Sequence, residues 1–196
     1  MDGLAGNGAG FPSHIEDARD RTALVFNELT YDLLSEEFPQ CRDTLVRGGF
    51  AENFVVTSPD LLPSVVCVGD VFRVGSALFE VSGPRFPCPK VDAWHNTSGL
   101  KAKSLENGWS GYFLRVLEPG VCCAGDDMTL LSRPHPGFTV ERICIGLWGP
   151  GAEKDISVEF LSYVANDLPQ LMERRFKDTA RTRLQRQLGG DATGEA

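Results

Sequence analysis

The chain contains 196 residues, with 19 lysine and arginine residues against 27 aspartate and glutamate residues, so its formal net charge is −8. This acidic balance argues against a protein that neutralises phosphates along nucleic acid. A hydrophobic content of 42% and a charged content of 23% are typical of globular proteins and exclude wholesale disorder, collagen and coiled coils. The length suits one main domain with a small appendage.

Two sequence features bear on location and redox state. No uncharged apolar run approaches the roughly 20 residues that span a bilayer, and residues 1–10 lack the apolar core of a secretory signal. We therefore expect a cytoplasmic protein without a membrane segment. The cysteines show no C-x-x-C spacing, which argues against a zinc ribbon or a disulfide framework and predicts reduced thiols. They are Cys41, Cys67, Cys88, Cys122, Cys123 and Cys144.

The first part of the chain predicts a tail, a strand and a helix. Residues 1–13 are rich in glycine and have no periodic apolar pattern, which predicts a disordered tail. Residues 22–26 are apolar and β-branched enough for a strand. Residues 28–38 have the apolar spacing of a short amphipathic helix, and Pro39 sets its end.

Residues 50–138 contain short apolar runs separated by turn residues, a pattern typical of a β-rich body. Between two of these runs, Gly75-Ser76 has the chemistry of a type II′ hairpin turn, because glycine readily takes the positive φ of the first central position. Pro119-Gly120 predicts a second turn. The predicted strands are 54–57, 65–68, 71–74, 77–82, 112–117 and 128–132.

Beyond Pro150 the pattern becomes helical, and the apolar spacing predicts helices over 156–165 and 169–188. Residues 169–190 hold six basic and two acidic side chains. That balance fits either a solvated helix face whose arginine stems cover apolar surface or a docking surface for an acidic partner. The predicted organisation is a disordered tail, a β-rich domain, a helical extension and a second disordered tail, over residues 1–13, 14–150, 151–190 and 191–196.

The segment from Ser82 to Lys90 follows a predicted strand and carries three prolines, so it should leave the sheet as a stiff loop. Cys88 lies between two of these prolines, which would hold its thiol on a rigid backbone. Arg85 and Lys90 would favour the thiolate, the form that acts as a nucleophile and as a ligand for soft metals. The residues alone leave two interpretations open, a reactive or metal-binding cysteine and an ordinary loop or buried cysteine.

Residues 48–56 form a second region of interest. The glycine pair at its start would let the backbone approach a ligand closely, while Glu52 and Asn53 offer polar groups before a strand. A plain turn with Asn53 as a cap explains the same residues. Motifs of nucleotide-binding folds, zinc proteases and α/β-hydrolases are absent from the sequence. We assign no catalytic role to the histidines and interpret Cys122 and Cys123 as buried small residues at the start of a strand rather than as a metal or redox site.

Several motifs, in their order and spacing, resemble the MOSC family, the domain at the C-terminus of molybdenum cofactor sulfurases. They are Asp20-Arg21-Thr22-Ala23-Leu24, Phe50-Ala51-Glu52-Asn53-Phe54, Val68-Gly69-Asp70, the segment from Ser82 to Lys90, Gly108-Trp109 and residues 115–120. The second and fourth are similar to the family's F-G-E-N-L and S-x-P-R-x-P-C-x-K patterns. The closest match is to the bacterial hydroxylaminopurine-resistance branch, whose C-terminal helical extension residues 156–188 resemble. The resemblance implies a mixed, β-rich α+β fold, with a closed or nearly closed MOSC-type β-barrel, helical decoration and a C-terminal helical appendage.

The resemblance also implies a chemistry. Cys88 matches the family's cysteine and would be the molybdenum ligand and the catalytic residue, while Arg85, Lys90 and Asn53 would bind the molybdenum cofactor (molybdopterin). The implied activity is that of an oxidoreductase that reduces small N-hydroxylated compounds such as hydroxylaminopurines or amidoximes. Electrons would come from an electron-donor reductase partner, because the sequence shows no flavin, haem or iron–sulfur motif. Pyridoxal phosphate binding is a further association of the family.

A different class of function fits the same residues. The chain would then be a binding or carrier module that holds the molybdenum cofactor, or a persulfide on Cys88, for another enzyme. A third reading is an interaction protein that has lost cofactor binding. At its start the chain departs from the family, because residues 14–21 stand where further strands and a basic H-G-G-x-D-[KR] loop are usual. We therefore expect a missing barrel edge, with unpaired backbone groups beside it.

Overall fold

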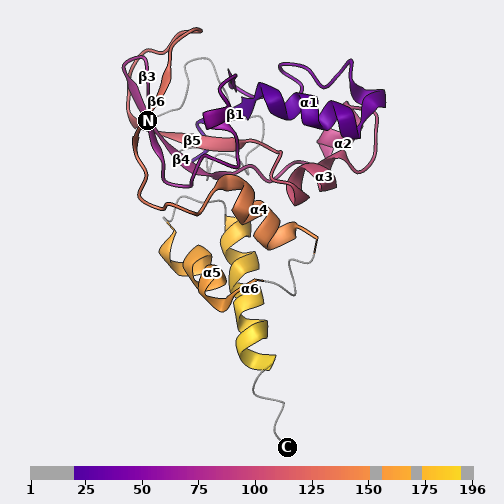
Figure 1. The fold of residues 1–196 in the computed structure, drawn as a ribbon, viewed down its shortest axis with the longest axis vertical. Helices are drawn as coiled ribbons and strands as arrows, with labels where there is room; N and C mark the ends of the chain where they lie inside the picture. The colour runs from indigo at the N-terminus through magenta and orange to yellow at the C-terminus, as the bar shows by residue number, and fades with distance from the viewer. Residues whose placement is uncertain (1–19, 151–155, 169–173, 191–196) are drawn as a thin grey trace, which may run out of the picture.

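The computed structural model describes residues 20–150, 156–168 and 174–190. The tails predicted at 1–13 and 191–196 lie outside these residues. Figure 1 shows a curled sheet with one group of helices, α1 to α3, at its side and a second group, α4 to α6, below it. No helix in the described part of the chain is long and apolar enough to cross a membrane.

Six strands form one sheet in the order β2-β1-β5-β4-β3-β6. Only the β1–β2 pair is parallel, and the other neighbouring strands in this sheet are antiparallel. The sheet curls into a half-barrel whose edges are β2 and β6 (Figure 1), so the expected β-rich α+β fold with helical decoration is confirmed. The strands are β1 (Ala23–Asn27), β2 (Phe54–Val56), β3 (Val71–Val74), β4 (Ala77–Pro84), β5 (Tyr112–Glu118) and β6 (Met128–Ser132).

The hairpin between β3 and β4 has the two-residue turn that the sequence predicts. Val74 pairs with Ala77 across it, and Gly75 has a φ of +55°. A Cβ at Gly75 would lie 2.3 Å from the carbonyl oxygen of Val121, so the turn also needs glycine for the close approach of the β5–β6 loop. The residues of the turn are therefore enough to predict it.

The strand predicted over 65–68 is wrong. The segment consists of turns with a single bridge between Cys67 and Thr139. The carboxylate of Asp70 accepts a hydrogen bond from the backbone N–H of Cys67 at 2.9 Å, which closes one of these turns. Val68 is apolar because it packs among the C-terminal helices, not because it lies in a sheet. An apolar run of four residues does not distinguish these two environments.

Helix α1 (Glu28–Glu37) confirms the helix predicted over 28–38. The side chain of Asn27 caps it by accepting a hydrogen bond from the backbone N–H of Leu29 at 3.0 Å. A 3₁₀ turn, η2 (Pro39–Cys41), follows, and a second one, η3 (Pro59–Leu61), follows β2.

Three helices lie inside or just beyond the segment that the sequence indicates as β-rich. They are α2 (Lys90–Trp94), α3 (Leu100–Glu106) and α4 (Val140–Trp148). The first two span five and seven residues, too few for a 3.6-residue period to stand out. Helix α4 begins at a standard cap, because the hydroxyl of Thr139 accepts a hydrogen bond from the backbone N–H of Arg142 at 3.1 Å.

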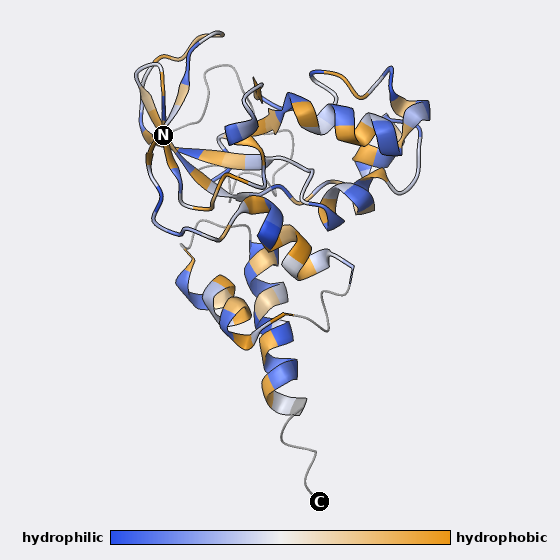
Figure 2. Ribbon diagram, viewed as in Figure 1, coloured by the Kyte–Doolittle hydropathy of each residue, from blue (hydrophilic) through white to orange (hydrophobic). Residues whose placement is uncertain are grey.

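The C-terminal appendage is helical, as predicted over 156–165 and 169–188. Helix α5 (Val158–Ser162) runs into a π-helical turn, η4 (Tyr163–Asp167), and α6 (Arg174–Gly190) follows; residues 169–173 lie outside the described residues. Phe176 and Ala180 of α6 are fully buried in a cluster shared with α4 and α5. Figure 2 shows apolar and polar bands alternating along α6, the pattern of a helix with one buried face.

Asp70, just before β3, is a fully buried carboxylate that binds the segment after the neighbouring strand β6. Arg133, just after β6, donates to Asp70 Oδ1 at 2.9 Å and to Oδ2 at 2.7 Å. These hydrogen bonds raise the pKa of Arg133 above its ordinary value. The pair therefore fixes the exit of β6 to the turn that enters β3.

We expect Arg133→Gln to lower the free energy of unfolding by about 3 kcal/mol, because it leaves the buried charge of Asp70 with only a backbone N–H partner. Urea denaturation at pH 7 measures the loss. The control is Arg73→Gln, at an exposed position on β3, which should change stability by less than about 0.5 kcal/mol. A loss below about 1 kcal/mol for Arg133→Gln would contradict this account of Asp70.

Candidate functional site

The loop after β4 presents Cys88 to solvent. Pro87 is buried and Cys88 is exposed, so the loop reaches the protein surface at Cys88. The backbone N–H of Val91 donates to the carbonyl of Cys88 at 3.0 Å, and the backbone N–H of Lys90 points at the sulfur with an N···Sγ distance of 3.5 Å. The loop predicted after the strand is thus present, and its thiol lies against the first turn of α2.

Arg85 lies beneath this loop with its guanidinium group buried. Its backbone is fixed on both sides, since its N–H donates to Gly111 O at 3.0 Å and its carbonyl accepts from the Ser110 hydroxyl at 2.7 Å. The guanidinium carbon lies 5.6 Å from the centroid of the Phe50 ring, and Nη1 is buried without a hydrogen-bond partner. Arg85 is therefore a cation with unused donor capacity.

The electrostatics of this position involve Cys88 directly. Burial lowers the pKa of Arg85, and the negative charges of Cys88, Glu52 and Tyr31, when ionised, oppose that shift. Arg85 and Cys88 are thus near enough for the charge of a Cys88 thiolate to act on Arg85, and the reverse effect, a thiolate favoured by Arg85, stays a prediction. The structure also adds Glu52 and Tyr31, whose long-range partnership no local sequence pattern indicates.

Glu52 organises the loop that precedes β2. Its carboxylate accepts hydrogen bonds from the Tyr31 hydroxyl at 2.6 Å, from Gly48 N at 2.5 Å and from Phe50 N at 3.2 Å. Burial, and then the carboxylate of Glu52, raise the pKa of Tyr31 far above its ordinary value. Tyr31 therefore stays protonated and acts as a hydrogen-bond donor to this loop.

The other two predicted cofactor-binding residues differ in how the structure uses them. The side-chain oxygen of Asn53 accepts a hydrogen bond from Leu24 N at 2.8 Å, which extends the β1–β2 pairing by one residue. Its NH₂ group is the part left for a ligand, so binding through the amide stays a prediction. Lys90 is exposed at the start of α2, two residues from Cys88.

His95 has a structural role beside the site. Its Nε2 lies 3.1 Å from Gly49 O and its Nδ1 lies 2.8 Å from the Thr44 hydroxyl, so the ring ties α2 to the loop that contains Phe50. Burial lowers the pKa of His95. The ring is therefore neutral at pH 7, and the Gly49 carbonyl places its proton on Nε2.

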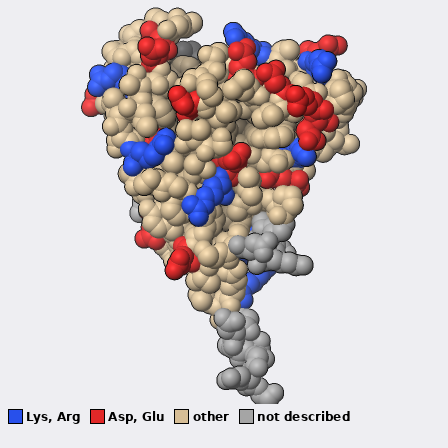
Figure 3. All heavy atoms as spheres, in the orientation of Figure 1, with Lys and Arg blue, Asp and Glu red and all other residues tan. Residues whose placement is uncertain are grey.

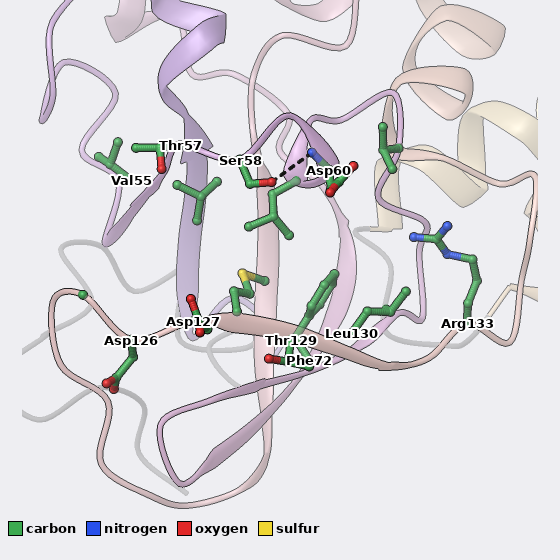
Figure 4. Close-up of a pocket in the computed structure, with 15 residues that line it drawn as sticks. Val55, Thr57, Ser58, Asp60, Phe72, Asp126, Asp127, Thr129, Leu130 and Arg133 are labelled. Atoms are coloured by element: carbon green, nitrogen blue, oxygen red, sulfur yellow. Dashed lines mark hydrogen bonds between the residues drawn. The ribbon is translucent and has the colours of Figure 1, made fainter.

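A separate cavity of about 860 Å³ opens between the two edge strands of the half-barrel (Figure 4). It is lined by β2 and β6, by segments 57–65 after β2 and 125–127 before β6, by Phe72 of β3 and by Arg133. Asp60, Asp126 and Asp127 supply carboxylates to its lining, as Figure 4 shows. None of Cys88, Arg85, Lys90 and Asn53 lines it, and sequence analysis did not indicate it.

The donor set around Cys88 fits an anionic, metal-bearing cofactor. A thiolate is a ligand for soft metals, and a buried guanidinium with an unpartnered Nη1 suits an anionic group. In the described ranges no three His, Cys, Asp or Glu side chains gather as a metal site. The described residues offer no observation in favour of pyridoxal phosphate.

Comparison with known proteins relates the chain to one domain family. A family model described as the MOSC domain matches residues 12–129. The chain is 32% identical over 125 residues to a protein named "Reductase" from Gibberella moniliformis, covering 63% of this chain and 22% of that protein. It is 35% identical over 111 residues to the uncharacterized protein YflK of Bacillus subtilis (55% of this chain, 49% of YflK) and 32% identical over 129 residues to YiiM of Escherichia coli (66% and 56%).

Solved structures share the fold over most of this chain. A crystal structure of a hypothetical protein matches with a TM-score of 0.77 and 25% identity, covering 96% of this chain and 79% of that one. YiiM from Escherichia coli matches with a TM-score of 0.71 and 26% identity, covering 88% of this chain and 80% of that one. By contrast, the chain spans only 22% to 56% of the length of the three curated relatives.

Ala51 occupies a left-handed backbone conformation, with a φ of +56°. We expect Ala51→Gly to raise the free energy of unfolding by roughly 0.5–1 kcal/mol, because relief of the left-handed strain outweighs the added flexibility of the unfolded chain. Thermal or urea unfolding measures this. The matched control is Ala102→Gly, in α3, which should destabilise by about 1 kcal/mol. Destabilisation by Ala51→Gly as well would refute the strain argument.

The lowered pKa of His95 predicts a pH effect on stability. In the unfolded chain His95 binds a proton below about pH 6.5, whereas in the folded protein its pKa is lower. The stabilisation from neutral His95 is therefore complete above about pH 6.5 and is lost as the pH falls. We expect wild type to lose more stability than His95→Gln between pH 7.5 and pH 5.5 in urea denaturation. Equal losses in the two proteins would assign the pH dependence to other groups.

Proposed function

The chain belongs to the MOSC domain family, and on that premise we propose that it is a molybdenum-cofactor-dependent oxidoreductase that reduces N-hydroxylated compounds, with Cys88 as the molybdenum ligand. The observation that carries this proposal is the exposed Cys88 thiol above the buried Arg85, whose Nη1 has no partner. The similarity to a protein named "Reductase" supports the oxidoreductase class. A cytoplasmic location is part of the same proposal.

Four side chains would bind different parts of the cofactor. Cys88 would coordinate molybdenum through its sulfur, on a loop that Pro87 and Pro89 keep from rearranging. Arg85 would favour the thiolate and offer a donor to anionic groups of the cofactor, and Lys90 and the NH₂ group of Asn53 would add further contacts. When bound, molybdopterin supplies two-electron oxygen-transfer chemistry at molybdenum.

The overall reaction sets what a partner must provide. Reduction of an N-hydroxyl group consumes two electrons and two protons and yields the amine and water. The sequence has no visible flavin, haem or iron–sulfur motif, so we assign electron supply to a separate reductase. The residues around Cys88 then need to hold the cofactor and balance its charge.

One observation favours a second candidate function. Cys88 is exposed and lies outside the cavity between β2 and β6, as a thiol that hands a group to another protein would be. The chain would then carry the molybdenum cofactor, or a persulfide on Cys88, without turnover. Dye-driven reduction of an amidoxime by the purified, cofactor-loaded protein would support the enzyme, and stoichiometric cofactor without turnover would support the carrier.

We expect Cys88→Ser to reduce the molybdenum and pterin content more than tenfold after expression in a host that makes the cofactor, because a hydroxyl is a poor soft-metal ligand at neutral pH. Elemental analysis and pterin fluorescence give the content per protein. The matched control is Cys123→Ser, a second exposed free cysteine, which should retain wild-type content.

The comparison requires that both variants remain folded, as circular dichroism and the unfolding midpoint would establish. Molybdenum retained by a folded Cys88→Ser protein would refute the assignment of the ligand. A wild-type protein that is folded and holds neither metal nor pterin would refute the enzyme and the cofactor carrier together.

A further inference from the structure

The half-barrel leaves two of its strands without an outer neighbour. The sheet order begins with β2 and ends with β6, and no strand in the described part of the chain pairs with the far side of either one. Along an edge strand, alternate backbone N–H and C=O groups are directed away from the sheet. These groups are a template on which a further strand can pair.

Strand β6 is an apolar edge with little protection against such pairing. Its five residues include no charged side chain and no proline. Leu130 and Leu131 are 41% and 48% exposed. Its pairing with β3 shifts register once, between Val71 and Phe72. Natural proteins usually place lysine or proline on an open edge, because an exposed apolar edge pairs with other chains.

The cavity of about 860 Å³ lies between these two edges, so an extended segment that enters it contacts both β2 and β6 (Figure 4). Its apolar lining comes from three strands, with Val55 and Val56 on β2, Phe72 on β3, and Met128 and Leu130 on β6. Extended peptides that add to a sheet gain affinity from backbone hydrogen bonds and specificity from pockets for alternate side chains. The cavity therefore offers both components of strand addition.

The charge of the lining favours a basic occupant. Asp60, Asp126 and Asp127 contribute carboxylates to it, whereas Arg133 donates to the buried Asp70 at 2.7 Å. Among the described residues, no lysine or arginine forms an ion pair with any of the three lining carboxylates. A cationic side chain that enters the cavity therefore meets complementary charge.

We propose that the cavity between β2 and β6 binds an extended, basic segment of a partner protein by strand addition. The segment pairs its backbone with an open edge, places apolar side chains against the cavity lining and brings lysine or arginine to the carboxylates. Cys88 does not line this cavity. The inference is therefore independent of whether the chain acts as an enzyme or as a carrier.

Two other occupants fit the observations less well. A second copy of the chain brings the same net charge of −8 and the same acidic lining, and carboxylates also gather over α1, as Figure 3 shows. Charge therefore opposes the association of two copies. A small cation compensates the carboxylates but leaves both strand edges unpaired, so it accounts for only one of the two features.

Three fluorescent peptides test the proposal by anisotropy on the full chain. The first is an octapeptide of alternating lysine and valine, and the second has glutamate in place of lysine. The third is the lysine–valine peptide with every backbone nitrogen methylated, which keeps its charge and removes its backbone donors. We expect the first peptide to bind at least about tenfold more tightly than either of the others, because it alone combines positive charge with backbone pairing.

Matched variants locate the binding. Asp60→Asn and Asp127→Asn should each weaken binding of the lysine–valine peptide about threefold, through loss of one opposite charge. Asp43→Asn, at an exposed position outside the cavity, should leave it unchanged. Leu130→Gln should weaken binding about fivefold, through loss of apolar contact. Its control is Leu131→Gln, at the next residue of β6, which is similarly exposed and does not line the cavity.

Circular dichroism and the unfolding midpoint establish that each variant is folded, and light scattering gives the mass of the free protein, which we expect to be that of a monomer. The proposal is overturned if the lysine–valine peptide does not bind, if the methylated peptide binds as tightly, or if the controls weaken binding as much as their matched variants. A dimer that Leu130→Gln dissociates and Leu131→Gln preserves would assign the edges to a second copy and would also overturn it.

Discussion

The carboxylate of Glu52 holds together parts of the chain that come from different regions of the sequence. It accepts hydrogen bonds from the Tyr31 hydroxyl of α1 at 2.6 Å and from two backbone N–H groups of its own loop at 2.5 and 3.2 Å. Bonds to an ionised acceptor are roughly twice as strong as neutral ones. The loop they fix carries Phe50, whose ring stacks on Phe26 of β1 at 4.5 Å and lies against the guanidinium of Arg85.

The same carboxylate contributes to the electrostatics of the site. A buried guanidinium is costly unless negative charge lies near it, and the negative charges of Cys88, Glu52 and Tyr31, when ionised, oppose the lowering of the pKa of Arg85 by burial. Negative charge delivered at Cys88, by a thiolate or by a bound anionic group, acts on a cation that the fold has already desolvated.

The sequence predicts the parts of the fold and of the site that depend on neighbouring residues, and not those that depend on residues far apart in the chain. The Gly75-Ser76 hairpin and the Cys88 loop follow from neighbouring residues and could be predicted, as could α1. The partnership of Glu52 with Tyr31 joins residues 21 apart, and no local pattern encodes it. The run over 65–68 is apolar enough to predict a strand, yet Val66 packs in the core of the sheet and Val68 among helices that the chain reaches much later. The oxygen of Asn53 lengthens the β1–β2 pair, a contact between residues 29 apart that no local pattern indicates, and binding of a ligand through its NH₂ group stays a prediction.

The basic C-terminal segment shows why charge counts alone leave function open. Both interpretations of residues 169–190 assume that its cations face outward, toward solvent or toward an acidic partner. Several of them also donate to backbone carbonyls of the helical cluster: Arg181 donates to Ala165 O, Arg183 to Gly146 O and the buried Lys177 to Leu168 O. Arg175 differs in that its guanidinium lies over the ring of Phe86, two residues before Cys88. The appendage therefore both stabilises the helical cluster and adds positive charge to the one loop in which the chemistry of this chain is expected to occur.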